Sequence, residues 1–468
     1  MAGGQFSSYN KVLPGIYINY KSKPNLSAST GDRGTVAIAR KMSWGPEGKI
    51  QEITDMNNLK PYLGYDITAD EMLFIREMTR GSSLTAGASK LLICRLPEQN
   101  ATKAALKIGE MTVNAKYSGS RGNGISIIVS PILDSKYTKP DAGGQEHYYQ
   151  WKVEVLVDNS KVEEFIRGTW TGGDTDKEAL IQDFKDIESN WISISGTGNL
   201  TNSVATFLTG GTDGEVATSG HNDFLKELGK LTFNVVIYDG NDTVTKGAYK
   251  SFVTRMCVDE GKYCVAVMSN YAADSEYCIN VVNSFTNEEG VALTVEQATW
   301  WVGGASSGAN YNESLTYHKI PGATAVTPEY ENTDLEKLLS KGNFLFFKLD
   351  GDILVLSDVN SFTSFTLDKN RSLSKNRVVR TLMQICNDLW LQYSKQYIGK
   401  VDVNDSGMKL IKGYGINYLN TIQANGGIQN FIPDDFVIKQ LDVDALTIGL
   451  AVQPVDSLEK IYMEITIG

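Results

Sequence analysis

The sequence predicts a mixed α/β plus β fold: a mainly parallel α/β core, an inserted β-sandwich, a C-terminal α+β region, and extended strand arms at both ends. Three observations predict it. From about residue 233, strand patterns alternate with helix patterns, which is typical of βαβ units. Between residues 98 and 212 the pattern is mostly β, punctuated by glycine and asparagine. The last eight residues alternate apolar and other side chains, as a strand with one buried face does.

Length and composition limit the class of protein. At about 150 residues per domain, 468 residues predict roughly three domains. Apolar residues make up 41% and charged residues 21%, which is ordinary for a soluble globular protein. The 44 basic and 55 acidic residues give a net charge of −11, which argues against nucleic-acid binding. No segment suits membrane insertion or secretion, so we expect a cytosolic protein.

Composition shifts along the chain divide it into six segments. We expect an N-terminal arm and linker, a first part of the core, an inserted β-sandwich, an α/β core domain, a C-terminal domain and a C-terminal arm. Their predicted bounds are residues 1–30, 31–97, 98–212, 213–355, 356–450 and 451–468.

Alternating patterns place the elements of the core. A strand at 233–238 is followed by a helix at 242–260, a strand at 263–268 and a helix at 274–285. Thr294 and Gln297 are spaced to cap another helix. Within the predicted sandwich we expect one helix, at 177–188.

The C-terminal region contains the strongest helix pattern. Residues 374–397 carry one apolar stripe and stop at a glycine. A second helix, near 407–424, contains Gly413 and Gly415, each costing about 1 kcal/mol relative to alanine. Close packing against a neighbouring element would explain them. Asp350-Gly351 predicts a tight hairpin just before this region.

Both chain ends have the pattern of strands that need a partner. A monomer can pair them with each other, and a polymer can insert each into a neighbour's sheet; the pattern alone leaves both open. The candidate intersubunit contacts are Ile16, Tyr17, Ile18, Tyr20, Ile461, Tyr462, Met463, Glu464, Ile465, Thr466 and Ile467.

A search for chemistry yields no catalytic residue, cofactor site or metal site. The five cysteines lack C-x-x-C spacing, and the three histidines lack metal-ligand spacing. There is no complete dinucleotide fingerprint, phosphate-binding loop or nucleophile elbow. Acidic pairs such as Asp434-Asp435 are most simply solvated turns, with a weak cation site left open.

Five segments together resemble the tail sheath proteins of contractile phages. They are LPGIYI (13–18), RGTVAI (33–38), WGPEG (44–48), YSGSRGN (117–123) and VQPVDSLEKIYM (452–463). Their order and spacing are similar to the family's over nearly the whole chain. The resemblance extends to sheaths of Gram-positive phages and of phage-tail-like bacteriocins, or tailocins.

The resemblance implies a contractile sheath subunit that is not an enzyme. Such proteins form a helical homo-oligomer of six-fold rings around an inner tail tube protein, and they meet baseplate and tail terminator proteins. Their core is subtilisin-like but not catalytic, their sandwich lies outermost, and their arms add strands to neighbours. The particle would be made in the bacterial cytoplasm and released on lysis.

The family's C-terminal region faces the tube, which implies contacts near Asp405, Lys409 and Lys412. A solvated helix face explains these three residues equally well. Two other functions stay open: a cytosolic α/β enzyme with an accessory β-domain, and the tube or baseplate protein of the same particle.

Overall fold

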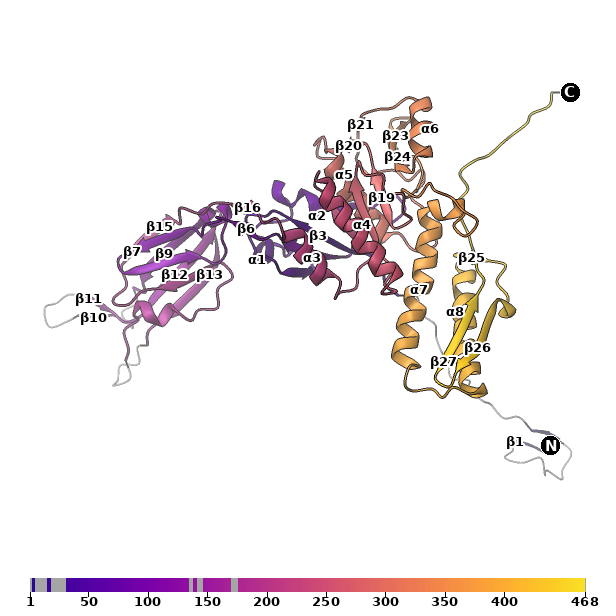
Figure 1. Cartoon of the computed structure of the whole chain (residues 1–468). Helices are drawn as coiled ribbons and strands as arrows, with labels where there is room; N and C mark the ends of the chain where they lie inside the picture. Colours follow the sequence, from indigo (N-terminus) through magenta and orange to yellow (C-terminus); the bar gives the residue numbers. More distant parts are fainter. Residues whose placement is uncertain are drawn as a thin grey trace. The chain divides into compact units, whose positions relative to one another are not determined.

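The computed structural model describes residues 31–133, 148–169 and 176–467 (Figure 1). It also describes the backbone of four short strands: β1 (Ala2–Gly4), β2 (Gly15–Tyr17), β10 (Thr138–Pro140) and β11 (Glu146–Tyr148). The chain divides into two compact units. Residues 32–387 with 456–468 are called the main unit here, and residues 1–31 with 388–455 the C-terminal unit.

A seven-stranded sheet forms the centre of the main unit. Its strand order is β22-β19-β18-β17-β3-β5-β4, and every pair is parallel except β4 with β5. The strands are β3 (Thr35–Arg40), β4 (Ile50–Ile53), β5 (Lys90–Arg95), β17 (Val235–Tyr238), β18 (Val265–Ser269), β19 (Cys278–Val281) and β22 (Asn343–Phe344). The prediction of a mainly parallel core sheet is confirmed.

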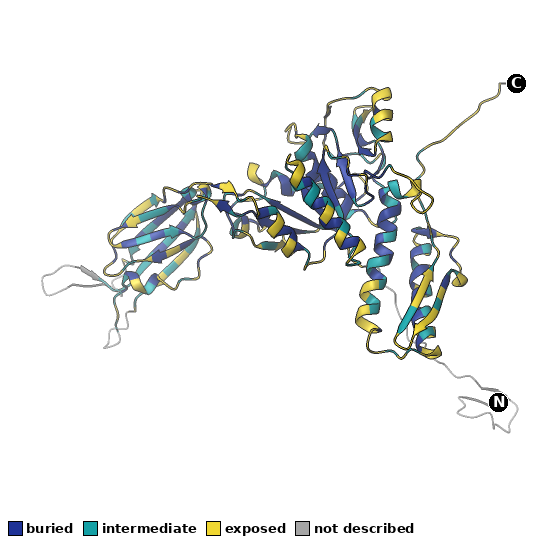
Figure 2. Ribbon diagram, viewed as in Figure 1, coloured by how far each residue is buried: buried dark blue, intermediate teal, exposed yellow. Residues whose placement is uncertain are grey.

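Helices cover both faces of this sheet, because its strands are apolar on both sides. In β3, Val36 and Ile38 pack toward α2 (Leu73–Arg80) and α5 (Val295–Gly308). Ala37 and Ala39 pack toward α3 (Gly220–Leu228) and α4 (Thr243–Val258). Figure 2 shows the resulting layers, with buried strands between helices that expose their outer faces.

Helix α5 begins as the sequence predicts. Thr294 Oγ1 accepts a hydrogen bond from the Gln297 N–H (3.2 Å), and Gln297 Oε1 accepts one from the Thr294 N–H (3.0 Å). Farther along, Gly304 lies against α2 so closely that a Cβ would stand 1.9 Å from the Met78 carbonyl oxygen. Glycine therefore permits the two helices to pack in backbone contact.

Residues 105–207 of the main unit contain two facing antiparallel sheets. One has the order β13-β12-β9-β15 and the other β14-β8-β7. Their inward side chains, such as Val113, Ile127 and Val155, form a separate core. The strands are β7 (Ala105–Ile108), β8 (Met111–Ala115), β9 (Ile125–Pro131), β12 (Trp151–Val157), β13 (Ser160–Arg167), β14 (Ile192–Ser195) and β15 (Ser203–Phe207).

Shorter elements complete the main unit. β6 (Glu98–Gln99) pairs with β16 (Glu215–Val216) where the chain enters and leaves the sandwich. β23 (Phe346–Leu349) and β24 (Asp352–Val355) form the predicted hairpin, with φ of 50° and 90° at Asp350 and Gly351. The others are α1 (Lys60–Leu63), α6 (Asn332–Ser340), β20 (Ser284–Thr286), β21 (Ala325–Thr327) and the 3₁₀ turns at 70–72, 120–124, 181–184 and 371–374.

Two long helices and two small sheets lie in the C-terminal region. α7 (Asn376–Gln396) and α8 (Asp405–Ala424) confirm the two predicted helices, and the boundary between the two units falls within α7. β26 (Phe436–Asp442) and β27 (Ala445–Leu450) form an antiparallel hairpin, and β25 (Ile428–Gln429) pairs with β28 (Gln453–Pro454). A 3₁₀ turn covers Pro433–Asp435.

Two predicted helices are wrong. Residues 274–285 contain strands β19 and β20 instead, because all four residues of β19 are buried within the sheet. Residues 177–188 contain only the 3₁₀ turn Ile181–Phe184, whose two end residues fill the sandwich core. The six predicted segment boundaries stay a prediction.

Candidate assembly site

The last described residues have no strand partner. Residues 455–467 contain no regular secondary structure, so the predicted C-terminal strand is absent from the single chain. A strand requires a second backbone to satisfy its N–H and C=O groups. In this segment only the Val455 N–H, which donates to the Gly427 carbonyl at 3.0 Å, bonds to another described stretch of backbone. Its large apolar side chains are exposed to solvent, from 74% at Ile461 to 93% at Ile467. Such a run of exposed apolar residues marks an interaction segment.

The polar anchor of this segment is Glu459, within the main unit. Glu459 Oε1 accepts hydrogen bonds from Thr316 Oγ1 and Ser357 Oγ, each at 2.9 Å, and Oε2 pairs with Lys375 Nζ. Burial alone would raise the pKa of Glu459, but Lys375 and the two hydroxyls lower it below its ordinary value. The carboxylate is therefore held ionised at neutral pH.

At the other end of the chain, β2 pairs in parallel with β1. Ile16 lies opposite Gly3, and Tyr17 lies opposite Gly4. Ile18 and Tyr20, the other predicted contacts, lie outside the described residues. Among the paired strands that the structure describes, the two chain ends do not pair with each other.

Asp388 holds the point where the N-terminal arm joins the C-terminal unit. The Gly31 N–H donates to both carboxylate oxygens of Asp388, at 3.1 and 3.3 Å. The Tyr418 hydroxyl donates to Oδ2 of the same group at 2.7 Å. One carboxylate thus ties the arm to both α7 and α8.

The β26–β27 hairpin is a two-stranded sheet. Among the described strands, each of the two pairs only with the other. Phe436 anchors the hairpin on α8, where its ring lies over Gly415. Most of the remaining surface is exposed, as Figure 2 shows, including Val437, Leu441, Val443 and Ile448. Free strand edges beside apolar side chains are a template for an added strand.

The three predicted tube contacts lie on the first half of α8. Asp405 and Lys409 are exposed and Lys412 is half-buried, and their spacing puts them on one side of the helix. Their role stays a prediction.

Three family models match this chain. They are the phage tail sheath protein central domain over residues 214–361, the phage tail sheath C-terminal domain over 368–468, and the tail sheath protein Gp18 domain III N-terminal region over 33–96. The solved sheath tail protein of Desulfitobacterium hafniense is 36% identical, with a TM-score of 0.79 over 96% of this chain and 99% of that one. This chain belongs to the phage tail sheath protein family.

Other comparisons also span nearly the whole chain. Two Bacillus subtilis proteins, YqbK and the phage-like element PBSX protein XkdK, are 32% and 29% identical, each over 100% of both chains. The contracted helical sheath of the anti-feeding prophage shares the fold, with a TM-score of 0.54 at 12% identity over 97% of this chain and 99% of that one.

The side chains of two histidines in this sheath protein are described, and both have structural contacts. His221 Nδ1 lies 3.0 Å from the Tyr249 hydroxyl, and His318 Nδ1 lies 2.9 Å from Ser82 Oγ. Burial lowers the pKa of both imidazoles. Within the described ranges, no three His, Cys, Asp or Glu side chains are grouped to hold a metal. None of the described helices is long and apolar enough to cross a membrane.

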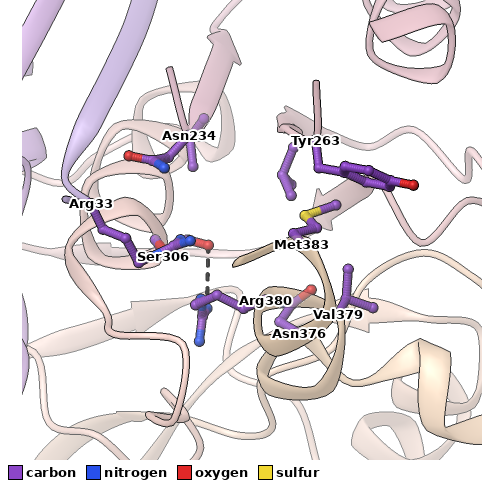
Figure 3. A pocket seen from close by; sticks show the side chains of 10 residues that line it. Arg33, Asn234, Tyr263, Ser306, Asn376, Val379, Arg380 and Met383 are labelled. Atoms are coloured by element: carbon purple, nitrogen blue, oxygen red, sulfur yellow. Dashed lines mark hydrogen bonds between the residues drawn. The ribbon is translucent and has the colours of Figure 1, made fainter. Parts of the chain in front are cut away.

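A small cavity lies between the sheet and α7. Figure 3 shows Arg33, Asn234 and Arg380 around it, with Arg380 Nη2 donating to Ser306 Oγ at 3.4 Å. Its volume is about 20 Å³, enough for a water molecule and too small for an organic ligand.

Two features of the sheath protein escape the sequence predictions. The β26–β27 hairpin carries a readable signal, because residues 436–450 are rich in β-branched residues around Asp442-Val443-Asp444. The Glu459 contacts carry no such signal, since their partners lie 84 to 143 positions away.

Proposed function

We propose that this chain is the structural subunit of a contractile tail sheath. It polymerises as stacked six-fold rings around an inner tube, and it shortens to drive the tube through a cell envelope. One observation carries the proposal: the chain has both a bare apolar arm and a two-stranded sheet that pairs with no other described strand. The arm lacks a strand partner in a single chain, and the two-stranded sheet has free edges that such an arm would fill.

The arm and the hairpin would join between subunits. In a strand, Ile461, Met463, Ile465 and Ile467 share one face, and Tyr462, Glu464 and Thr466 share the other. The intersubunit contacts we propose are these residues together with Ile16, Tyr17, Ile18 and Tyr20 of the N-terminal arm. The β26–β27 hairpin is the acceptor, with one free edge for each kind of arm.

The energetics suit reversible addition of single arms and stable whole assemblies. Burying the four apolar residues of one face stabilises by about 6–12 kcal/mol. Ordering eight backbone residues costs about 8–16 kcal/mol. Backbone hydrogen bonds to a preformed hairpin then decide whether the net free energy of adding one arm is favourable. Repetition of the contact around a ring makes dissociation of a subunit improbable.

The sheath role also assigns the other parts. The α/β core would have the subtilisin-like arrangement without catalysis, and the sandwich would lie on the outside of the cylinder. We infer a non-enzymatic role from the family, since its named relatives are sheath proteins. Contraction needs no nucleotide or cofactor if the extended state is kinetically trapped.

Further copies of this chain are the first partner we propose. The fold shared with the anti-feeding prophage helical sheath supports self-assembly. The inner tube protein, the baseplate and the tail terminator are the other partners of a sheath. For the tube, we propose contact through Asp405, Lys409 and Lys412 on α8.

Deletion of residues 460–468 tests the proposal. The truncated protein should fold with an unchanged melting temperature, because its missing residues are exposed in the single chain. It should remain in the supernatant when wild-type protein pellets as rods, as seen by negative-stain microscopy. Full-length rods from the truncated protein would contradict the exchanged arm.

A further inference from the structure

The exposed C-terminal arm starts at a fixed point on the main unit. Thr316, Ser357 and Lys375 come from three separate stretches of chain, and all three contact the carboxylate of Glu459. Lys375 Nζ also donates to Ser357 Oγ at 3.1 Å, which closes the network. Three side chains thus hold Glu459 on the main unit, and one of them belongs to Lys375, the residue directly before α7.

Beyond Glu459 this restraint stops. Lys460 is exposed, and no hydrogen bond or ion pair joins residues 460–467 to another described residue. The side chains of Lys375 and Glu459 are only 18% and 20% exposed, so water weakens their interaction less than that of a surface pair. The chain is thus fixed to the main unit at Glu459 and makes no such contact from Lys460 onward.

A fixed origin matters for a strand that must add to another sheet. Side chains alternate with a period of two, so a slip of one residue turns the whole apolar face outward. Ile461 follows Glu459 by two residues, a distance of about 7 Å in extended chain. Holding Glu459 in place consequently limits which residue of the arm can meet each position of the acceptor.

We propose that Glu459, held by Lys375, Ser357 and Thr316, is a clamp that sets the origin and register of the C-terminal arm as it enters a second copy of this chain. The inference rests on the proposed strand exchange. Glu459 acts as a positioning residue, because the contact with the second copy is made by residues 461–467.

Trypsin cleavage after Lys460 tests the clamp in the full-length monomer. Lys375→Met removes the clamp and leaves the residues around the cleaved bond unchanged. Release of the peptide 461–468, followed by mass spectrometry, should become about tenfold faster, as expected for the loss of a charge-assisted hydrogen bond. Lys348→Met is the matched control, since Lys348 is exposed, and it should be cleaved at the wild-type rate. Equal rates for the two variants would overturn the clamp, whatever happens in assembly.

Assembly of Glu459→Ala tests the register. Its rods should form at least about tenfold less efficiently than wild type in a pelleting assay. Glu464→Ala, which removes a carboxylate from the arm itself, is the control and should assemble more readily than Glu459→Ala. If Lys375→Met is cleaved faster while Glu459→Ala assembles like wild type, the role in register is wrong. If wild-type protein forms no rods, the proposed sheath function fails, and the trypsin result still decides the clamp.

Discussion

At the scale of single residues, the two faces of the C-terminal arm differ in polarity. Ile465 lies on the all-apolar face of the alternation, and Glu464 lies on the other face. In the single chain Ile465 is 78% exposed, so its replacement has little effect on the fold. Any effect of changing it must therefore come from contacts between subunits.

We expect Ile465→Asp to abolish rod formation while the monomer's melting temperature stays at the wild-type value. An unpaired carboxylate buried between subunits costs about 3–5 kcal/mol, which exceeds the margin of one arm. Glu464→Gln should assemble normally. Pelleting and microscopy measure both variants, and equal assembly by the two would remove this strand from the interface.

Two glycines of α8 provide a second comparison at the residue scale. A Cβ on Gly415 would stand 2.3 Å from Phe436 Cε2, whereas a Cβ on Gly413 would meet nothing within 4 Å. Within this chain, the predicted close packing is therefore confirmed at Gly415 and wrong at Gly413. Gly415→Ala should destabilise the C-terminal unit by about 1–3 kcal/mol. Gly413→Ala should stabilise it by up to about 1 kcal/mol. Hydrogen exchange of the α8 amides measures both, and protection that changes equally in the two variants would contradict this packing.

At the scale of elements, the sandwich is connected to the core by two adjacent strands. Glu98 lies opposite Val216, and Gln99 lies opposite Glu215. A two-residue turn joining Gln99 to Glu215 would therefore close a hairpin without moving either strand.

We expect the protein lacking residues 100–214 to fold and to form rods, provided that the apolar surface uncovered at Trp44 is made polar. Excision uncovers Trp44, which is fully buried and stacks on Trp191 at 5.1 Å. Trp44→Ser should therefore be included to keep the shortened protein in solution. Thermal melting and microscopy measure the outcome. A shortened protein that no longer folds would show that residues 100–214 belong to the core.

The sequence predicts local elements better than pairings between distant strands. Helix α7 and the hairpin at Asp350-Gly351 were predicted correctly, because a long apolar stripe and two residues with positive φ act locally. The strand β19 was predicted as a helix. Its four residues are all buried, and a short apolar run has no periodicity that distinguishes a helix from a central strand.

At the scale of the whole molecule, the missing information is long-range. Glu459 meets Lys375 across 84 positions, and nothing near either residue in the sequence marks the contact. The predicted C-terminal strand shows the same limit. Its alternation is clear, but the single chain provides no partner for it, and under the proposed strand exchange that partner belongs to another subunit.

Strand exchange between subunits is tested most directly by an electron cryomicroscopy map of rods assembled from the full-length protein. We expect residues 461–467 to form a strand hydrogen-bonded to the β26–β27 hairpin of another subunit, with Ile465 facing the shared core. Residues 461–467 that remain unpaired in the rods, or that fold back onto their own chain, would contradict the exchange of strands between sheath subunits.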